Sequence, residues 1–112
     1  MNALLIRLID YSVRVMTITD DFSKDRSLFK ISDQLSRSAS SIGANYAEAQ
    51  SASSKRDFHN KIRVALKEAR ESEYWLELLK RRSDHTQTIE PILSETVAII
   101  RILTAISNKT KP

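Results

Sequence analysis

The stretch that decides the fold covers residues 34–79 and reads QLSRSASSIGANYAEAQSASSKRDFHNKIRVALKEARESEYWLELL. Its first half is crowded with Ser, Ala and Gly, and its second half alternates apolar with basic residues at helical spacing. This pattern predicts two long helices joined by a turn of small residues at positions 51–54. The segments on either side repeat the same spacing, so we expect two further helices that bury what these two expose.

Apolar residues recur every three or four positions in all four segments, which is typical of amphipathic helices. Ser54 followed by Asp57 matches a capping box at the start of the third helix. Thr88 is the expected cap of the fourth helix, and Pro91 would then lie in its first turn, where a missing N–H does little harm. The helices are predicted at residues 3–22, 26–51, 54–82 and 88–108.

Short links between four helices predict one all-α domain over residues 1–112, folded as an antiparallel up-down-up-down bundle. One Gly and two Pro provide too little turn chemistry for a sheet of many strands. A chain of 112 residues buries only a modest core, so assembly with further copies would help to stabilise it.

The middle of the second helix, residues 36–44, consists mostly of residues with small side chains, namely Ser, Ala and Gly. Gly43 alone costs roughly 1 kcal/mol relative to Ala. We expect close approach of another helix to compensate, either in the same chain or in a neighbouring subunit. Asn45 lies at an inward position, so it must find hydrogen-bond partners, and such a residue can set the register between helices.

Composition and spacing argue against catalysis and cofactors. The chain has no cysteine, which excludes disulfides and thiolate chemistry. A di-iron bundle needs Glu-x-x-His, but Arg56 and Arg82 precede the two histidines, His59 and His85, at that spacing. His59 is expected at the surface or its boundary. No Gly-x-Ser-x-Gly elbow or glycine-rich phosphate loop occurs. We therefore expect no enzyme, no cofactor and no metal.

We expect neither a membrane span nor an export signal in this sequence. No apolar run approaches the ~20 residues that span a bilayer. The apolar N-terminal segment is interrupted by Arg7, Asp10 and Arg14, unlike the core of a signal peptide. We expect a soluble, cytoplasmic protein, and its net charge of +4 favours an acidic partner.

A basic stripe runs along the third predicted helix. Arg56, Arg63, Lys67 and Arg70 follow one another at spacings of seven, four and three, and a second pair, Lys30 and Arg37, lies a heptad apart on the second helix. Cations on one face can neutralise nucleic-acid phosphates. The alternative is a solvated face balanced by nearby glutamates. Without a helix-turn-helix, RNA-recognition motif or zinc finger, any binding should be directed at the backbone.

Residues 41–49, SIGANYAEA, resemble the SIPANIAEG signature of the four helix bundle proteins, also called 23S rRNA intervening-sequence proteins. Residues 54–58, SKRDF, are similar to the S-K-x-[DE]-F motif of that family, and the likeness continues to residue 80. Gly43, Tyr46 and Ala49 stand where the family commonly has Pro, Ile and Gly. We therefore expect a straighter second helix that runs on toward Ser51.

This resemblance implies a bacterial protein whose protomers assemble into a ring-shaped homo-oligomer, typically a pentamer. Relatives include the accessory variability determinant of diversity-generating retroelements, which binds nucleic acid and a reverse transcriptase. The implied partners are further copies, RNA or DNA, and a reverse transcriptase. The alternative is a protein–protein adaptor or structural oligomer with no nucleic-acid role. The residues expected in packing or subunit contacts are Ser41, Gly43, Asn45, Tyr46, Glu48 and Trp75.

Overall fold

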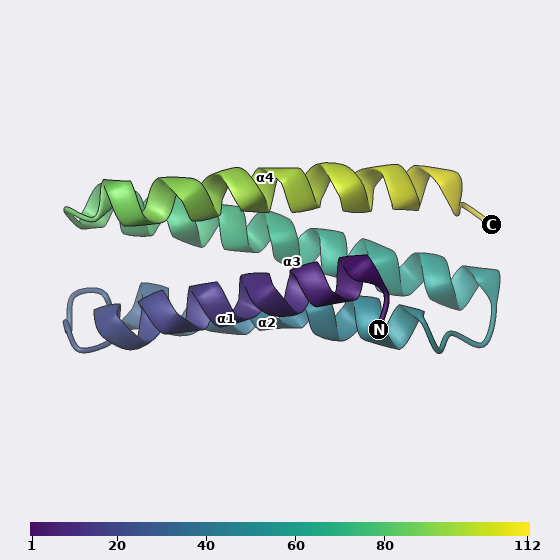
Figure 1. Cartoon of the computed structure of the whole chain (residues 1–112), viewed down its shortest axis with the longest axis horizontal. Helices are drawn as coiled ribbons and strands as arrows, with labels where there is room; N and C mark the ends of the chain where they lie inside the picture. The colour runs from purple at the N-terminus through teal and green to yellow at the C-terminus, as the bar shows by residue number, and fades with distance from the viewer.

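The computed structural model describes all 112 residues and contains four helices and no strand, as the sequence predicts. The connections α1–α2 and α3–α4 lie at one end of the molecule, and the α2–α3 connection lies at the other end (Figure 1). The molecule measures 44 × 21 × 19 Å along its principal axes. None of the helices has an apolar stretch that could cross a lipid bilayer. The four helices are α1 (Ala3–Phe22), α2 (Phe29–Ala49), α3 (Lys55–Arg82) and α4 (Thr86–Lys109).

Helix α1 has the predicted bounds, whereas α2 begins later and ends earlier than predicted. The late start has a local cause. The Asp25 carboxylate accepts hydrogen bonds from the backbone N–H of Ser27 at 2.9 Å and from its hydroxyl at 2.7 Å. Such a turn competes with helix formation. The expected continuation of α2 toward Ser51 is wrong, because the helix ends at Ala49.

The starts of α3 and α4 differ in their capping. Ser54 caps α3 as predicted, since its hydroxyl accepts from the Asp57 N–H at 3.0 Å. The expectation for α4 is wrong: the helix starts two residues before Thr88, and its N-cap, His85, makes no side-chain capping bond. Pro91 is therefore the sixth residue of α4 instead of a first-turn residue, and its missing N–H removes one internal helix bond.

The core is a single cluster of apolar side chains from all four helices. Helix α2 packs against both α1 and α3, and α3 also packs against α4. Helices α1 and α4 touch far less. Burial of each large side chain contributes about 1.5–3 kcal/mol to folding. The fully buried leucines and isoleucines are Leu8, Leu35, Ile42, Ile62, Leu76, Leu79, Ile89, Ile99 and Leu103.

The small residues of α2 allow both neighbouring helices to approach closely. A Cβ atom placed on Gly43 would lie 3.4 Å from the Cβ of Leu8 in α1. The expected close approach is thus confirmed, and it occurs within one chain. On the other side, the hydroxyls of Ser38 and Ser72 are hydrogen-bonded at 2.8 Å between α2 and α3. Asn45 bonds only the Ser41 carbonyl of its own helix, at 2.8 Å, so it makes no hydrogen bond between helices.

A buried hydrogen bond joins α1 to α4, where few other contacts exist. The Tyr11 hydroxyl lies 2.7 Å from Thr96 Oγ1, and both residues are fully buried. Burial raises the pKa of the Tyr11 phenol to about 12. The folded state therefore favours the neutral phenol more strongly than the unfolded chain does.

Substitutions at Gly43 should separate helix propensity from packing. Gly43→Ala should change the free energy of unfolding by less than about 1 kcal/mol, because a gain in propensity offsets a tight but tolerable contact. Gly43→Leu should destabilise by about 1–3 kcal/mol, because its larger side chain would collide with Leu8. Urea denaturation measures both. Equal stability of the two variants would show that α1 does not approach α2 at this point.

The Tyr11 phenol should make stability fall at alkaline pH. An unfolded tyrosine ionises near pH 10, and the folded one at about 12, so the contribution is complete below about pH 10. It should be lost as pH rises from 10 toward 12. We expect the stability advantage of the wild type over Tyr11→Phe, measured by urea denaturation, to shrink across that window. An advantage that is the same at about pH 8 and about pH 11 would contradict this reasoning.

Candidate nucleic-acid interface

Four cations on α3 are free of ion pairs. Arg56, Arg63, Lys67 and Arg70 are exposed. None takes part in any of the protein's ion pairs, whose partners lie within 4.0 Å. Glu77, one of the acids that could have balanced the stripe, pairs with Lys80 and Arg81 farther along the helix. The positive charges of the stripe are therefore available to a ligand.

Two adjoining depressions bring three of these cations together. Arg63 and Lys67 line one depression of about 420 Å³ with Asn60 and Val64. They also line a second depression of about 220 Å³ with Arg70, Leu66 and Ser107, and Ser107 belongs to α4. The surface is shallow and open, so it suits an extended anionic chain better than an enclosed small molecule.

The cationic surface continues at the end of α4. A further depression of about 210 Å³ is lined by Lys55 and Phe58 of α3 together with Lys109, Thr110 and Lys111. Lys109 and Lys111 are not among the predicted residues, because no spacing within the chain shows that α4 ends beside the start of α3. We call the whole set the α3–α4 basic surface, and its cations are Lys55, Arg56, Arg63, Lys67, Arg70, Lys109 and Lys111.

Contacts with α3 hold the C-terminal end of α4 in place. The Thr110 hydroxyl bonds the Ile106 carbonyl at 2.7 Å and lies 3.3 Å from Nδ1 of His59. His59 is buried there, with 7% of its surface exposed, and does not lie at the surface or its boundary as expected. The histidine thus holds Thr110, the residue between Lys109 and Lys111, beside α3.

The cations of α2 are separate from this surface. Arg37 forms an ion pair with Asp33 at 3.3 Å, and Lys30 is exposed without an ion-pair partner. Neither lines a depression with the cations of α3. Lys61, which neighbours the stripe, pairs with Glu48 of α2 at 3.8 Å. Of the candidate set, the structure therefore brings together only Arg63, Lys67 and Arg70, and Arg56 lines none of these depressions.

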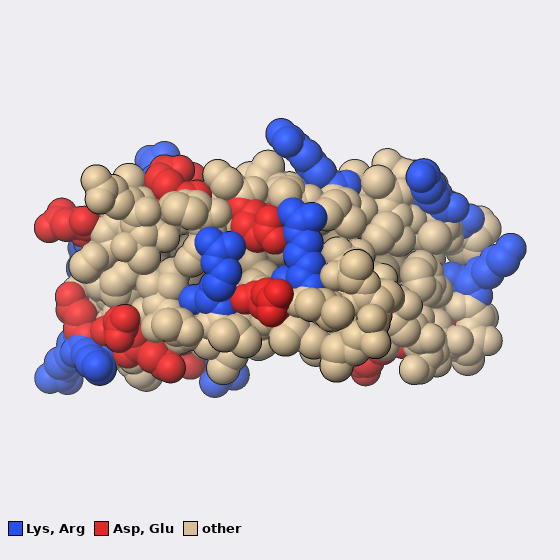
Figure 2. Space-filling model, viewed as in Figure 1, with Lys and Arg blue, Asp and Glu red and all other residues tan.

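Acidic side chains beside the stripe on α3 do not pair with its cations. Partial burial raises the pKa of Glu68, and the nearby carboxylate of Glu71 raises it further. Glu68 forms no ion pair with Lys67. By contrast, the α1 and α4 face carries blue and red side chains close together (Figure 2). There Arg7 Nη2 lies 2.7 Å from a carboxylate oxygen of Glu95.

Several residues expected in packing or subunit contacts lie inside the protomer. Gly43 and Tyr46 are buried, and the Tyr46 hydroxyl accepts from Asn2 at 3.1 Å. The Ser41 hydroxyl donates to the Arg37 carbonyl at 2.8 Å. Trp75 is half-buried, with its ring edge-on to that of Tyr74 at a centroid distance of 5.1 Å.

No group of three or more His, Cys, Asp or Glu residues lies close enough together to hold a metal ion.

Comparison with known proteins agrees with this architecture. The sequence model of the family described as "23S rRNA-intervening sequence protein" matches residues 5–105. The chain belongs to this family. The resemblance predicted from residues 41–49 is confirmed. The chain is also similar to the crystal structure of a protein of unknown function from the S23 ribosomal protein family of Bacteroides thetaiotaomicron VPI-5482. The two sequences are 37% identical. The two share a TM-score of 0.88, and the match covers 94% of this chain and 98% of that one. No curated protein matches.

Chemical cross-linking should test where α4 ends. A short amine-reactive cross-linker should join Lys55 to Lys109 or Lys111 within one chain, because all three line one depression. Peptide mass spectrometry of the monomer-sized band identifies the linked pair. Modification of all three lysines without a link between them would show that the end of α4 is not held beside α3.

Proposed function

We propose that this family member is a non-enzymatic, oligomeric protein that associates with nucleic acid through the α3–α4 basic surface. The observation that supports the proposal best is the set of cations free of ion pairs along α3 and at the end of α4. Arg63 and Lys67 lie at its centre, and Lys109 and Lys111 extend it from a second helix. RNA or DNA is the expected partner, and the name of the family favours RNA.

Phosphate contacts would account for most of the binding. Cations that neutralise phosphates release condensed counterions, so affinity falls steeply with salt. The chain has no helix-turn-helix, RNA-recognition motif or zinc finger, so contacts should be with the backbone and tolerate many sequences. Tyr74 is 58% exposed one turn beyond Arg70, where its ring can stack on an unpaired base.

Assembly would multiply these weak contacts. We propose that the up-down-up-down protomer, with consecutive helices antiparallel, forms a ring-shaped homo-oligomer, typically a pentamer. The placement of the connections in Figure 1 supports the antiparallel order. Several copies on one nucleic acid raise the effective concentration of every later contact. Such a cytoplasmic ring could serve as an accessory factor to a reverse transcriptase or as an RNA-associated protein.

A second candidate function is a protein–protein adaptor or structural oligomer without nucleic acid. An exposed apolar stripe on α1 favours it. Ile6, Ile9, Val13 and Met16 are between 39% and 57% exposed and recur at spacings of three and four. Such a stripe on a small protein is a common feature of interaction surfaces. Recovery of a protein partner after nuclease treatment would favour this function over the first.

Neutralising the centre of the basic surface should weaken nucleic-acid binding. The triple variant Arg63→Gln, Lys67→Gln and Arg70→Gln should lose at least about tenfold in affinity for a labelled single-stranded RNA at low ionic strength. The slope of log affinity against log salt should fall by about 0.7 for each lost phosphate contact. Fluorescence anisotropy across a salt series measures both, and a DNA strand of the same sequence tests RNA preference.

The matched control is Arg14→Gln, Lys24→Gln and Arg26→Gln. These three cations are also exposed and free of ion pairs, so the net charge changes equally. The control should bind nearly as well as the wild type. Equal losses in both triple variants would mean that net charge alone attracts the nucleic acid. No binding by the wild type at low ionic strength would contradict the proposed function.

A further inference from the structure

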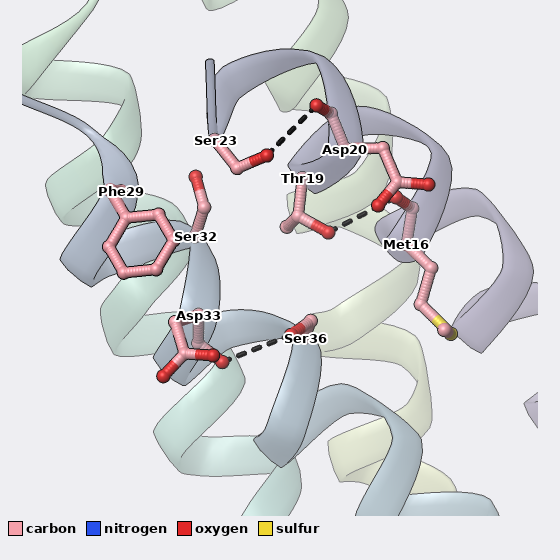
Figure 3. Close-up of a pocket in the computed structure, with 8 residues that line it drawn as sticks. All are labelled: Met16, Thr19, Asp20, Ser23, Phe29, Ser32, Asp33 and Ser36. Carbon is pink, nitrogen blue, oxygen red and sulfur yellow. Dashed lines mark hydrogen bonds between the residues drawn. The ribbon is translucent and has the colours of Figure 1, made fainter. Parts of the chain in front are cut away.

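A small pocket lies between the end of α1 and the start of α2, away from the cations of α3 (Figure 3). Its volume is about 190 Å³. Apart from one thioether and one aromatic ring, every lining side chain carries a carboxylate or a hydroxyl, and none is basic. We call it the α1–α2 pocket, and it is lined by Met16, Thr19, Asp20, Ser23, Phe29, Ser32, Asp33 and Ser36.

The lining offers hydrogen-bond acceptors almost exclusively. The hydroxyl of Thr19 donates to the Met16 carbonyl at 3.1 Å, and those of Ser23 and Ser36 donate to the carbonyls of Asp20 and Asp33 at 3.0 Å (Figure 3). Each of these hydroxyls has thus used its hydrogen within its own helix and presents lone pairs to the pocket. A complementary ligand must supply donors.

Ser32 is an independent sign that a ligand belongs here. The residue is 1% exposed, yet its Oγ has no hydrogen-bond partner in the protein. Its oxygen points into the space between the two helices (Figure 3). Buried hydroxyls without partners are uncommon, because the group has lost its bonds to water. A donor that enters the pocket would complete the missing bond.

The two acidic residues of the lining, one on each helix, favour a cation. Asp20 has no ion pair, and Asp33 has only the exposed helical pair with Arg37 at 3.3 Å, which contributes little stability. An ammonium or guanidinium group would supply both positive charge and several N–H donors. At the rim, Met16 and Phe29 are 48% and 56% exposed, so an alkyl stem can pack against them and a cation can lie over the ring.

The size and surroundings indicate that this cation belongs to a protein. Pockets for drug-sized ligands commonly measure about 300–1,000 Å³, so 190 Å³ suits the head of one side chain better. Met16 is also the last member of the exposed apolar stripe that begins at Ile6 on α1. A free amine would leave that stripe uncovered. A folded partner could cover the stripe and fill the pocket together.

We propose that the α1–α2 pocket receives a lysine or arginine side chain from a second copy of this chain. Charge complementarity supports this occupant: the chain has a net charge of +4 and many cations without ion pairs on other elements. A contact between two different surfaces is head-to-tail, and it closes into a ring or continues as a filament. The inference therefore rests on the homo-oligomeric part of the proposed function.

The test compares self-association of isosteric variants. Asp20→Asn with Asp33→Asn removes the two charges of the pocket and preserves its shape. Asp10→Asn with Asp21→Asn is the matched control, because both residues are exposed acids of α1 that do not line the pocket. Sedimentation equilibrium should show at least about tenfold weaker association for the pocket variant, and little change for the control. Equal association of the two variants would overturn the proposal.

The variant Ser32→Ala separates a role in self-association from a role in folding. Because Oγ has no partner within the chain, its removal should leave the unfolding midpoint unchanged or raised. Association should nevertheless weaken several-fold if the incoming cation bonds Oγ. A variant that unfolds more readily and associates normally would show that Ser32 only supports the fold, and would count against the pocket.

Two further outcomes separate this inference from the proposed function. A wild type that stays monomeric at all concentrations, yet binds RNA, would overturn the pocket proposal and leave the basic surface intact. Agmatine, which bears a guanidinium and an ammonium, serves as the free-amine probe. If it shifts the amide resonances of Thr19 and Ser32 while association is the same in the pocket and control variants, the pocket binds a small amine and not a second copy.

Discussion

The close packing of α2 against its two neighbours is the constraint on which the rest of the structure depends. Small side chains permit it on both sides: Gly43 meets Leu8 of α1, and Ser38 bonds Ser72 of α3. Because α2 lies between these helices, it sets how each of them is turned about its own axis. The position of Leu8 against Gly43 leaves the opposite stripe of α1 exposed. The outer face of α3 is exposed for the same reason.

The α3–α4 basic surface and the α1–α2 pocket differ in chemistry. The α3–α4 basic surface carries cations without ion pairs, whereas the α1–α2 pocket carries carboxylates and hydroxyl lone pairs. Other charged residues form ion pairs within the protomer, as Arg7 does with Glu95 and Lys61 with Glu48. A chain with one cationic and one acidic region has the charge distribution needed for both a nucleic-acid partner and a further copy of itself.

Predictions from local sequence motifs were right for the cap of α3 and wrong for the start of α4 and the burial of His59. Ser54 caps α3 because a hydroxyl and a nearby backbone N–H suffice for the motif. The start of α4 was misplaced, because its cap, His85, makes no side-chain bond that a pattern could reveal. Likewise, His59 resembles a surface residue in the sequence, but it is buried where the end of α4 crosses α3.

The sequence by itself determined the four helices, the bulk of the core and the stripe from Arg56 to Arg70, because each depends on spacing within a single helix. Only the tertiary structure decided which distant residues meet. It placed Lys109 and Lys111 beside Lys55, and it left the hydroxyl of Ser32 without a partner in the lining of the α1–α2 pocket. The physical reason is that periodicity defines the face of a helix, whereas the axial position of one helix against another depends on packing across the whole interface.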